Sequence, residues 1–160
     1  MELDLDRIDP ELAPVLADLP PELSNITRDN ISVVRDMMGA RPVEPPPSTA
    51  RIEKRRIPGS DATDGEVPVV IYRRESSGIQ AGLLWIHGGG YLFGSAEDDR
   101  ARGIAEQLDC TVVSVDYRLA PEDPFPAGPD DCYAALLWMV ENAASLQIDP
   151  DRIAIGGASA

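Results

Sequence analysis

Long apolar runs, cysteine, histidine and positively charged residues are all scarce in this sequence of 160 residues. No apolar run approaches the roughly 20 residues that a membrane-spanning helix requires, so the sequence predicts no membrane span. The first residues, Met1 to Asp6, are acidic, whereas a secretory signal begins with basic residues. We therefore expect a soluble protein that stays in the cytoplasm.

The two cysteines, Cys110 and Cys132, lie in apolar stretches and lack the spacing of metal ligands. They predict buried thiols rather than a disulfide framework, and we expect no metal site and no cofactor. Fourteen basic residues oppose 28 acidic ones, which gives a formal net charge of −14. Nucleic acid and anionic membranes would be repelled by this charge, so neither is an expected partner.

Residues 1–47 are predicted to form two short helices and a linker. Asp9 before Pro10 is typical of a helix start, and Thr27 is expected to begin a second helix that ends at Gly39. The proline-rich segment 41–47 cannot continue a helix and is expected to be extended. We therefore expect a domain boundary there, with residues 48–160 forming the core.

The remaining sequence alternates between strand and helix patterns, which predicts an α/β fold with a mostly parallel sheet flanked by helices. Turn-rich surroundings of the first two strands suggest an antiparallel start, whereas the later apolar runs are nearly continuous, as in buried parallel strands. The expected strands are 51–57, 67–73, 82–86, 111–115 and 153–157, and the expected helices are 95–108 and 129–144.

Three acidic residues, Glu97, Asp98 and Asp99, stand together near the start of the first of these helices. A metal site is one interpretation of such a cluster. The other is a helix start, in which Ser95 caps the helix and the carboxylates interact favourably with its dipole. We favour the helix start, which requires no metal.

A buried strand is expected to end abruptly in the sequence His87-Gly88-Gly89-Gly90. A backbone without side chains can approach a substrate and direct its amide hydrogens at one point, as the oxyanion of an acyl-transfer intermediate requires. The alternatives are a flexible loop or a phosphate-binding loop. The glycine spacing and the Lys-Ser/Thr ending of phosphate loops are missing, which favours the oxyanion interpretation.

The last strand is followed directly by Gly157-Ala158-Ser159-Ala160, which is most of a Gly-x-Ser-x-Gly motif. In a nucleophile elbow, small residues around the serine permit a strained turn that exposes its hydroxyl, and the following amide completes the oxyanion hole. This fragment alone would be weak evidence. Together with the glycine segment about 70 residues upstream, it becomes a specific signal for acyl transfer.

The two motifs are joined by DYRLAPE at 116–122 and PFPA at 124–127. With these segments the whole chain resembles the hormone-sensitive-lipase family of α/β-hydrolases, including the opening at 8–12, which is similar to the family's cap helices. The resemblance implies a carboxylic-ester hydrolase with Ser159 as nucleophile, segment 116–127 supporting the active-site floor, and oxyanion donors at Gly88, Gly89 and Ala160. Family members often have an acidic residue where this chain has Ala158.

His87 is the one histidine in the sequence, which makes it a candidate base for Ser159. In this fold, however, the catalytic acid and histidine follow the nucleophile along the chain, and Ser159 is the penultimate residue. We therefore expect both partners to lie outside this sequence. His87, together with Gly90, is instead expected to support the glycine loop, which is the segment 87–90.

Three functions fit these observations. The first is an ester hydrolase acting on a small-molecule ester through an acyl-enzyme. The second is a non-catalytic small-molecule-binding protein on the same scaffold, as in the gibberellin receptors of this family. The third is an inactive fragment truncated after the nucleophile elbow. The sequence gives no indication of the oligomeric state or the acyl group.

Overall fold

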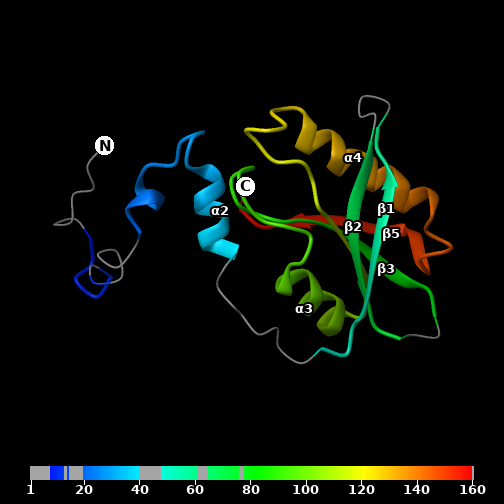
Figure 1. Ribbon diagram of the computed structural model, residues 1–160. Coiled ribbons are helices and arrows are strands. Elements are labelled where there is room, and N and C mark those ends of the chain that lie inside the picture. Colours follow the sequence, from blue (N-terminus) through cyan, green and yellow to red (C-terminus); the bar gives the residue numbers. More distant parts are fainter. Residues whose placement is uncertain are drawn as a thin grey trace. The chain divides into compact units, whose positions relative to one another are not determined.

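The computed structural model describes residues 8–12, 14, 20–39, 48–60, 65–75 and 78–159. The chain divides into two compact units, Met1–Val43 and Glu44–Ala160 (Figure 1). All the strands of the described residues belong to the second unit. No helix in the described part of the chain is both long and apolar enough to cross a membrane.

The first unit contains the 3-10 helix η2 (Pro21–Ser24) and the helix α2 (Ile31–Gly39). The end of α2 is as expected, but its predicted start at Thr27 is wrong. The Asn30 side chain accepts a hydrogen bond from the Thr27 amide at 2.7 Å and donates one to Asn25, which favours a turn ahead of the helix. The helix therefore begins four residues later.

The predicted N-terminal helix is described only at its beginning. Asp9 accepts hydrogen bonds from the amides of Glu11 and Leu12, which closes a turn. Most of the remaining residues of this predicted helix, and the linker at 41–47, lie outside the described residues.

The second unit is built on a five-stranded sheet in the order β1-β2-β4-β3-β5. β3 pairs in parallel with β4 and β5, whereas β1 with β2 and β2 with β4 are antiparallel. The expected antiparallel start and the three neighbouring parallel strands are confirmed, and the sheet as a whole is mixed. The strands are β1 (Arg51–Pro58), β2 (Glu66–Arg73), β3 (Gln80–Ile86), β4 (Thr111–Val115) and β5 (Ile148–Gly157).

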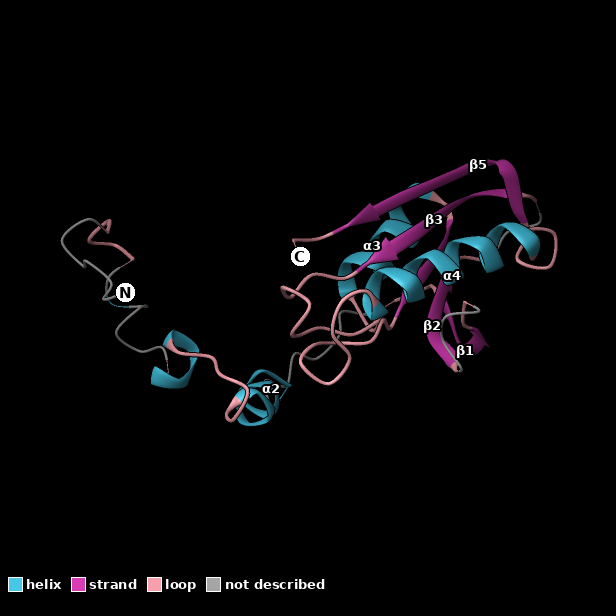
Figure 2. Cartoon of the chain, turned by 90° about the horizontal axis from the view of Figure 1, so that it is seen from above, coloured by secondary structure: helices cyan, strands magenta, loops and turns pink. Residues whose placement is uncertain are grey.

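Two helices, α3 (Asp99–Leu108) and α4 (Ala127–Glu141), cover opposite faces of this sheet (Figure 2). Alternate residues of each strand point to opposite faces, so two apolar layers form. Ala135 and Met139 of α4 pack with Leu84 in one layer. Ala101 of α3 packs with Trp85 in the other.

Helix α3 begins at Asp99, so the predicted capping by Ser95 is wrong. Asp98 is the N-cap, because its carboxylate accepts a hydrogen bond from the Arg100 amide at 2.8 Å. Ser95 closes a turn with the Glu97 amide just before it. A carboxylate here also interacts favourably with the positive end of the helix dipole.

Helix α4 spans Ala127–Glu141 rather than the predicted 129–144. The amide and the side chain of Asn142 both donate to the Trp138 carbonyl, and Ala143 then turns back onto Val140, which ends the helix. Both cysteines are free: Cys110 is buried and Cys132 is partly buried. Desolvation raises the pKa of the Cys132 thiol to about 12, so it stays protonated.

The centre of the sheet provides a test of this packing. Leu84 is 1% exposed, whereas Ile79, just before the same strand, is 71% exposed. We expect Leu84→Ala to lower the free energy of unfolding by about 2–5 kcal/mol, and Ile79→Ala to change it by less than about 0.5 kcal/mol. Urea unfolding measures the free energy of unfolding of both variants. Equal losses would contradict the assignment of the β3 interior to the core.

Candidate active site

Three loops meet at one edge of the sheet. β3, β4 and β5 run in parallel with Ile86 level with both Val115 and Gly157, so their carboxyl ends lie side by side. The contact between β3 and β5 continues past the strands, since the Ala158 amide donates to the Ile86 carbonyl at 3.1 Å. The glycine loop, the segment after β4 and Ser159 are therefore neighbours.

The glycine loop has a backbone that requires glycine. Gly89 and Gly90 have φ angles of +125° and +61°, and Tyr91 follows at 60°. Side chains are disfavoured in this region, and a Cβ at Gly89 would in addition collide with the Phe93 backbone. The amides of Leu92 and Phe93 both donate to the Gly89 carbonyl, at 3.0 and 3.1 Å, and close the turn.

The glycine loop and the predicted nucleophile are in direct contact. The Gly89 amide donates a hydrogen bond to the carbonyl oxygen of Ser159 at 2.9 Å. A Cβ on Gly88 would collide with that same carbonyl oxygen, so this approach requires glycine. The Ser159 residue is exposed to solvent. Ala160, the third predicted oxyanion donor, lies outside the described residues.

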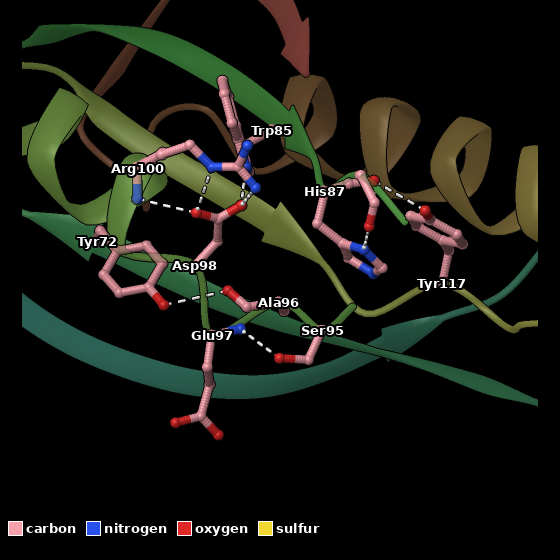
Figure 3. Close-up of polar contacts among 10 residues, drawn as sticks. Tyr72, Trp85, His87, Ser95, Ala96, Glu97, Asp98, Arg100 and Tyr117 are labelled. Atoms are coloured by element: carbon pink, nitrogen blue, oxygen red, sulfur yellow. Dashed lines mark hydrogen bonds and ion pairs between the residues drawn. The ribbon is translucent and has the colours of Figure 1, made fainter. Parts of the chain in front are cut away.

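His87 is buried at the start of this loop, with 2% of its surface exposed. Its Nδ1 lies 2.9 Å from the Gly88 carbonyl oxygen, and because a carbonyl oxygen only accepts, Nδ1 is assigned as the donor of this hydrogen bond. Among the described residues, Nε2 is buried without a hydrogen-bond partner. The ring stacks on Tyr117 at 4.1 Å with an interplanar angle of 11° (Figure 3).

Hydrogen bonds and an ion pair join the segment after β4 to its neighbours, which are His87, helix α4 and the turn before α3. The Tyr117 hydroxyl donates to the His87 carbonyl at 2.8 Å. Arg118 makes a bidentate ion pair with Asp131 of α4, and Asp131 also accepts from the Arg118 amide at 2.9 Å. The neighbouring Asp116 accepts from the Ala96 amide at 3.0 Å. These side chains hold the loop after β4 against the glycine loop and the start of α4.

The acidic residues 97–99, at the start of α3, are engaged in structural contacts. Asp98 accepts hydrogen bonds from Trp85 and Arg100 as well as capping the helix (Figure 3). Burial alone would raise the pKa of Asp98, but the hydrogen bonds from Arg100 and Trp85 outweigh it and hold the pKa below its usual value. Glu97 pairs with Lys54 and Asp99 with Arg102. The described residues contain no group of three or more potential metal ligands.

Sequence reasoning did not identify Tyr117, Arg118 or Asp131 as individual site residues. Their partners lie 13 to 30 positions away in the chain, so no local pattern records the contacts.

A cleft of about 340 Å³ lies nearby, between β1, β2 and the turn at 95–97. Its walls include Arg56 and Asp116 but not the glycine loop or Ser159.

The fold and the arrangement of this edge define an α/β-hydrolase, and comparisons with known proteins agree. A family model described as alpha/beta hydrolase fold matches residues 83–160. Carboxylesterase NlhH of Mycobacterium tuberculosis is 40% identical over 162 aligned residues, which cover 96% of this chain and 48% of NlhH. The chain has the α/β-hydrolase fold, and its similarity to these esterases agrees with the resemblance to the hormone-sensitive-lipase family.

Solved structures show the same similarity. A bacterial heroin esterase superposes with a TM-score of 0.73 at 36% identity, covering 97% of this chain and 50% of the esterase. Esterase LipW from Mycobacterium marinum gives a TM-score of 0.77 at 32% identity, covering 96% and 49%. The chain therefore spans about half the length of these relatives.

The tight fit around His87 can be tested at Gly94. Its φ angle is +99°, and a Cβ there would collide with the His87 ring and the Gly88 carbonyl. We expect Gly94→Ala to lower the free energy of unfolding by roughly 2–4 kcal/mol. Gly103→Ala is the control, because the new Cβ meets nothing closer than 3.8 Å inside α3.

The control change should raise the free energy of unfolding by up to about 1 kcal/mol, because alanine favours a helix over glycine. Urea unfolding of the full-length protein reports both variants. If Gly94→Ala were as stable as the unsubstituted protein, the described packing of the glycine loop would be wrong.

Proposed function

We propose that this chain supplies the nucleophile and the oxyanion loop of a serine carboxylic-ester hydrolase. The observation that supports it best is the 2.9 Å hydrogen bond from the Gly89 amide to the Ser159 carbonyl oxygen. A peptide carbonyl resembles the carbonyl of an ester. The Gly89 amide is thus within reach of a carbonyl oxygen beside Ser159, although this internal contact has to yield when a substrate binds.

In the proposed reaction, Ser159 Oγ attacks the carbonyl carbon of the ester and transfers its proton to a base. The negative charge on the carbonyl oxygen is stabilised by the amides of Gly88, Gly89 and Ala160. The alcohol then leaves with a proton, and water releases the acid from the acyl-enzyme. No metal takes part in this scheme.

The base is proposed to lie outside residues 1–160. His87 is poorly suited to the role, because its Nδ1 is held by the Gly88 carbonyl and its ring is buried against Tyr117. The esterases that this chain resembles are about twice as long. In this fold the acid and the histidine follow the nucleophile. His87 and Gly90 are therefore assigned to loop support.

The nucleophile can be tested by Ser159→Ala in the full-length protein, meaning residues 1–160 together with any sequence that follows them. We expect turnover of a short-chain chromogenic ester to fall by about a million-fold, to the background of the assay. Ser145→Ala is a matched control, because Ser145 is exposed in the turn after α4 and its hydroxyl donates to Asn142. It should keep full activity. Activity that survives Ser159→Ala would contradict the proposal.

If the full-length protein bound esters without hydrolysing them, the alternative of a non-catalytic small-molecule-binding protein would be favoured. Equilibrium dialysis with a non-hydrolysable amide analogue separates this outcome from simple inactivity. Residues 1–160 that on their own neither bind nor hydrolyse esters would leave the inactive fragment as the interpretation of this chain.

The origin of the base can be tested separately with residues 1–160 alone. We expect this chain to be at best a very poor esterase, because it lacks two members of a triad that acts as a unit. Joining it to the part of NlhH that follows the matched segment should restore turnover. Robust turnover by residues 1–160 that disappears with Ser159→Ala would show that the base lies within them and would make His87 the leading candidate.

A further inference from the structure

We infer that Tyr117 is a positioning residue that aims the amide of Gly88, while His87 aims the amide of Gly89. This inference rests on the proposed function, since it concerns how the oxyanion donors are held. It extends that proposal, because it assigns a separate side chain to each of two donors and adds Tyr117 to the site.

The argument begins with the planarity of the peptide bond. The carbonyl of one residue and the amide of the next lie in one rigid plane and point in opposite directions. Fixing a carbonyl oxygen therefore fixes the direction of the following N–H. The carbonyl of His87 shares its peptide plane with the Gly88 amide, and the carbonyl of Gly88 shares its plane with the Gly89 amide.

Both of these carbonyl oxygens are held by side chains. The Tyr117 hydroxyl donates to the His87 carbonyl at 2.8 Å, which fixes the plane that carries the Gly88 amide. The His87 Nδ1 donates to the Gly88 carbonyl at 2.9 Å, which fixes the plane that carries the Gly89 amide. The two rings stack at 4.1 Å, so displacement of one disturbs the other (Figure 3).

The two hydrogen bonds matter because glycine does little to restrict its own backbone dihedral angles. Gly88 and Gly89 have no side chain to limit their dihedral angles, so their amides can turn away from a substrate unless something outside the loop holds them. A mobile donor must be ordered during the reaction, which reduces its effect on the barrier. The two hydrogen bonds remove this freedom before substrate arrives.

Tyr117 is itself held firmly. It is 3% exposed and lies two residues after the end of β4. The adjacent Arg118 is clamped by Asp131 of α4. Gly128 at the start of α4 leaves room for the ring, since a Cβ there would lie 3.2 Å from Tyr117 Cδ2. Burial raises the pKa of Tyr117 to about 12, so the hydroxyl remains a donor throughout the neutral range.

The test uses Tyr117→Phe in the full-length protein, which removes the hydroxyl and keeps the stacked ring. Tyr133→Phe is the matched control, because Tyr133 lies on α4 and is 59% exposed. We expect kcat for a short-chain ester to fall by about tenfold, less than the hundredfold or more for loss of a whole donor. KM should stay within about twofold, because aim matters most in the transition state. The control should leave both constants unchanged.

A second readout does not depend on activity. Rigid backbone has a ¹⁵N order parameter of about 0.85. In Tyr117→Phe the order parameter of the Gly88 amide should fall clearly below this value, and in Tyr133→Phe it should remain unchanged. An unchanged value would overturn the inference, whatever the kinetics. A fall in a protein without esterase activity would leave the positioning role intact and refute the proposed function. A fall without loss of kcat in an active protein would also overturn the inference.

A second variant covers the case in which Tyr117→Phe fails to fold. Gly128→Ala keeps every hydrogen-bonding group but places a methyl group against the Tyr117 ring and the Arg118 carbonyl, both at 3.2 Å. It should lower kcat and the Gly88 order parameter in the same direction. Gly103→Ala is its control. Normal kcat and normal order in Gly128→Ala, with the ring displaced in a crystal structure, would overturn the inference.

Discussion

The parallel pairing of β3 with β4 on one side and β5 on the other is the constraint on which the rest of this structure depends. Parallel strands end at the same edge, so the loops that follow them meet although they are distant in sequence. The glycine loop, Tyr117 and Ser159 come together for this reason alone. The helices on the two faces exclude water from the central strand β4, all of whose residues are buried.

The absence of side chains at two glycines shapes the site, as the side chains around them do. Glycine at position 88 lets the Ser159 carbonyl approach, and glycine at position 94 leaves space for the His87 ring. Around these gaps, buried polar groups are satisfied by neighbours: the hydroxyl of Tyr117 by a carbonyl, and Asp131 by Arg118. An unsatisfied buried group would cost stability, so these contacts fix one arrangement of the loops. The orphaned Nε2 of His87 is the exception in the described part of the site.

The chain shares its fold with esterases of about twice its length. In the described residues, β5 forms an edge of the sheet, and Ile155 on it is 59% exposed. The parallel strands of this class are ordinarily covered on both faces. The proposed division of the active site agrees with this difference in length. The nucleophile and the oxyanion loop are proposed to lie on this chain, and the base is proposed to come from outside it.

The sequence determined the five strands, although β5 begins at Ile148 rather than at 153. It also determined the order of strand and helix and the two glycine-rich motifs, because apolar periodicity and glycine runs are local patterns. It misplaced the starts of α2 and α3, since the deciding hydrogen bonds came from Asn30 and Asp98 rather than from the expected caps. Only the tertiary structure decided that Tyr117 stacks on His87 and that Asp131 clamps Arg118. Such contacts join residues far apart in the chain, and it is the parallel register of the sheet, not any local pattern, that brings them within bonding distance.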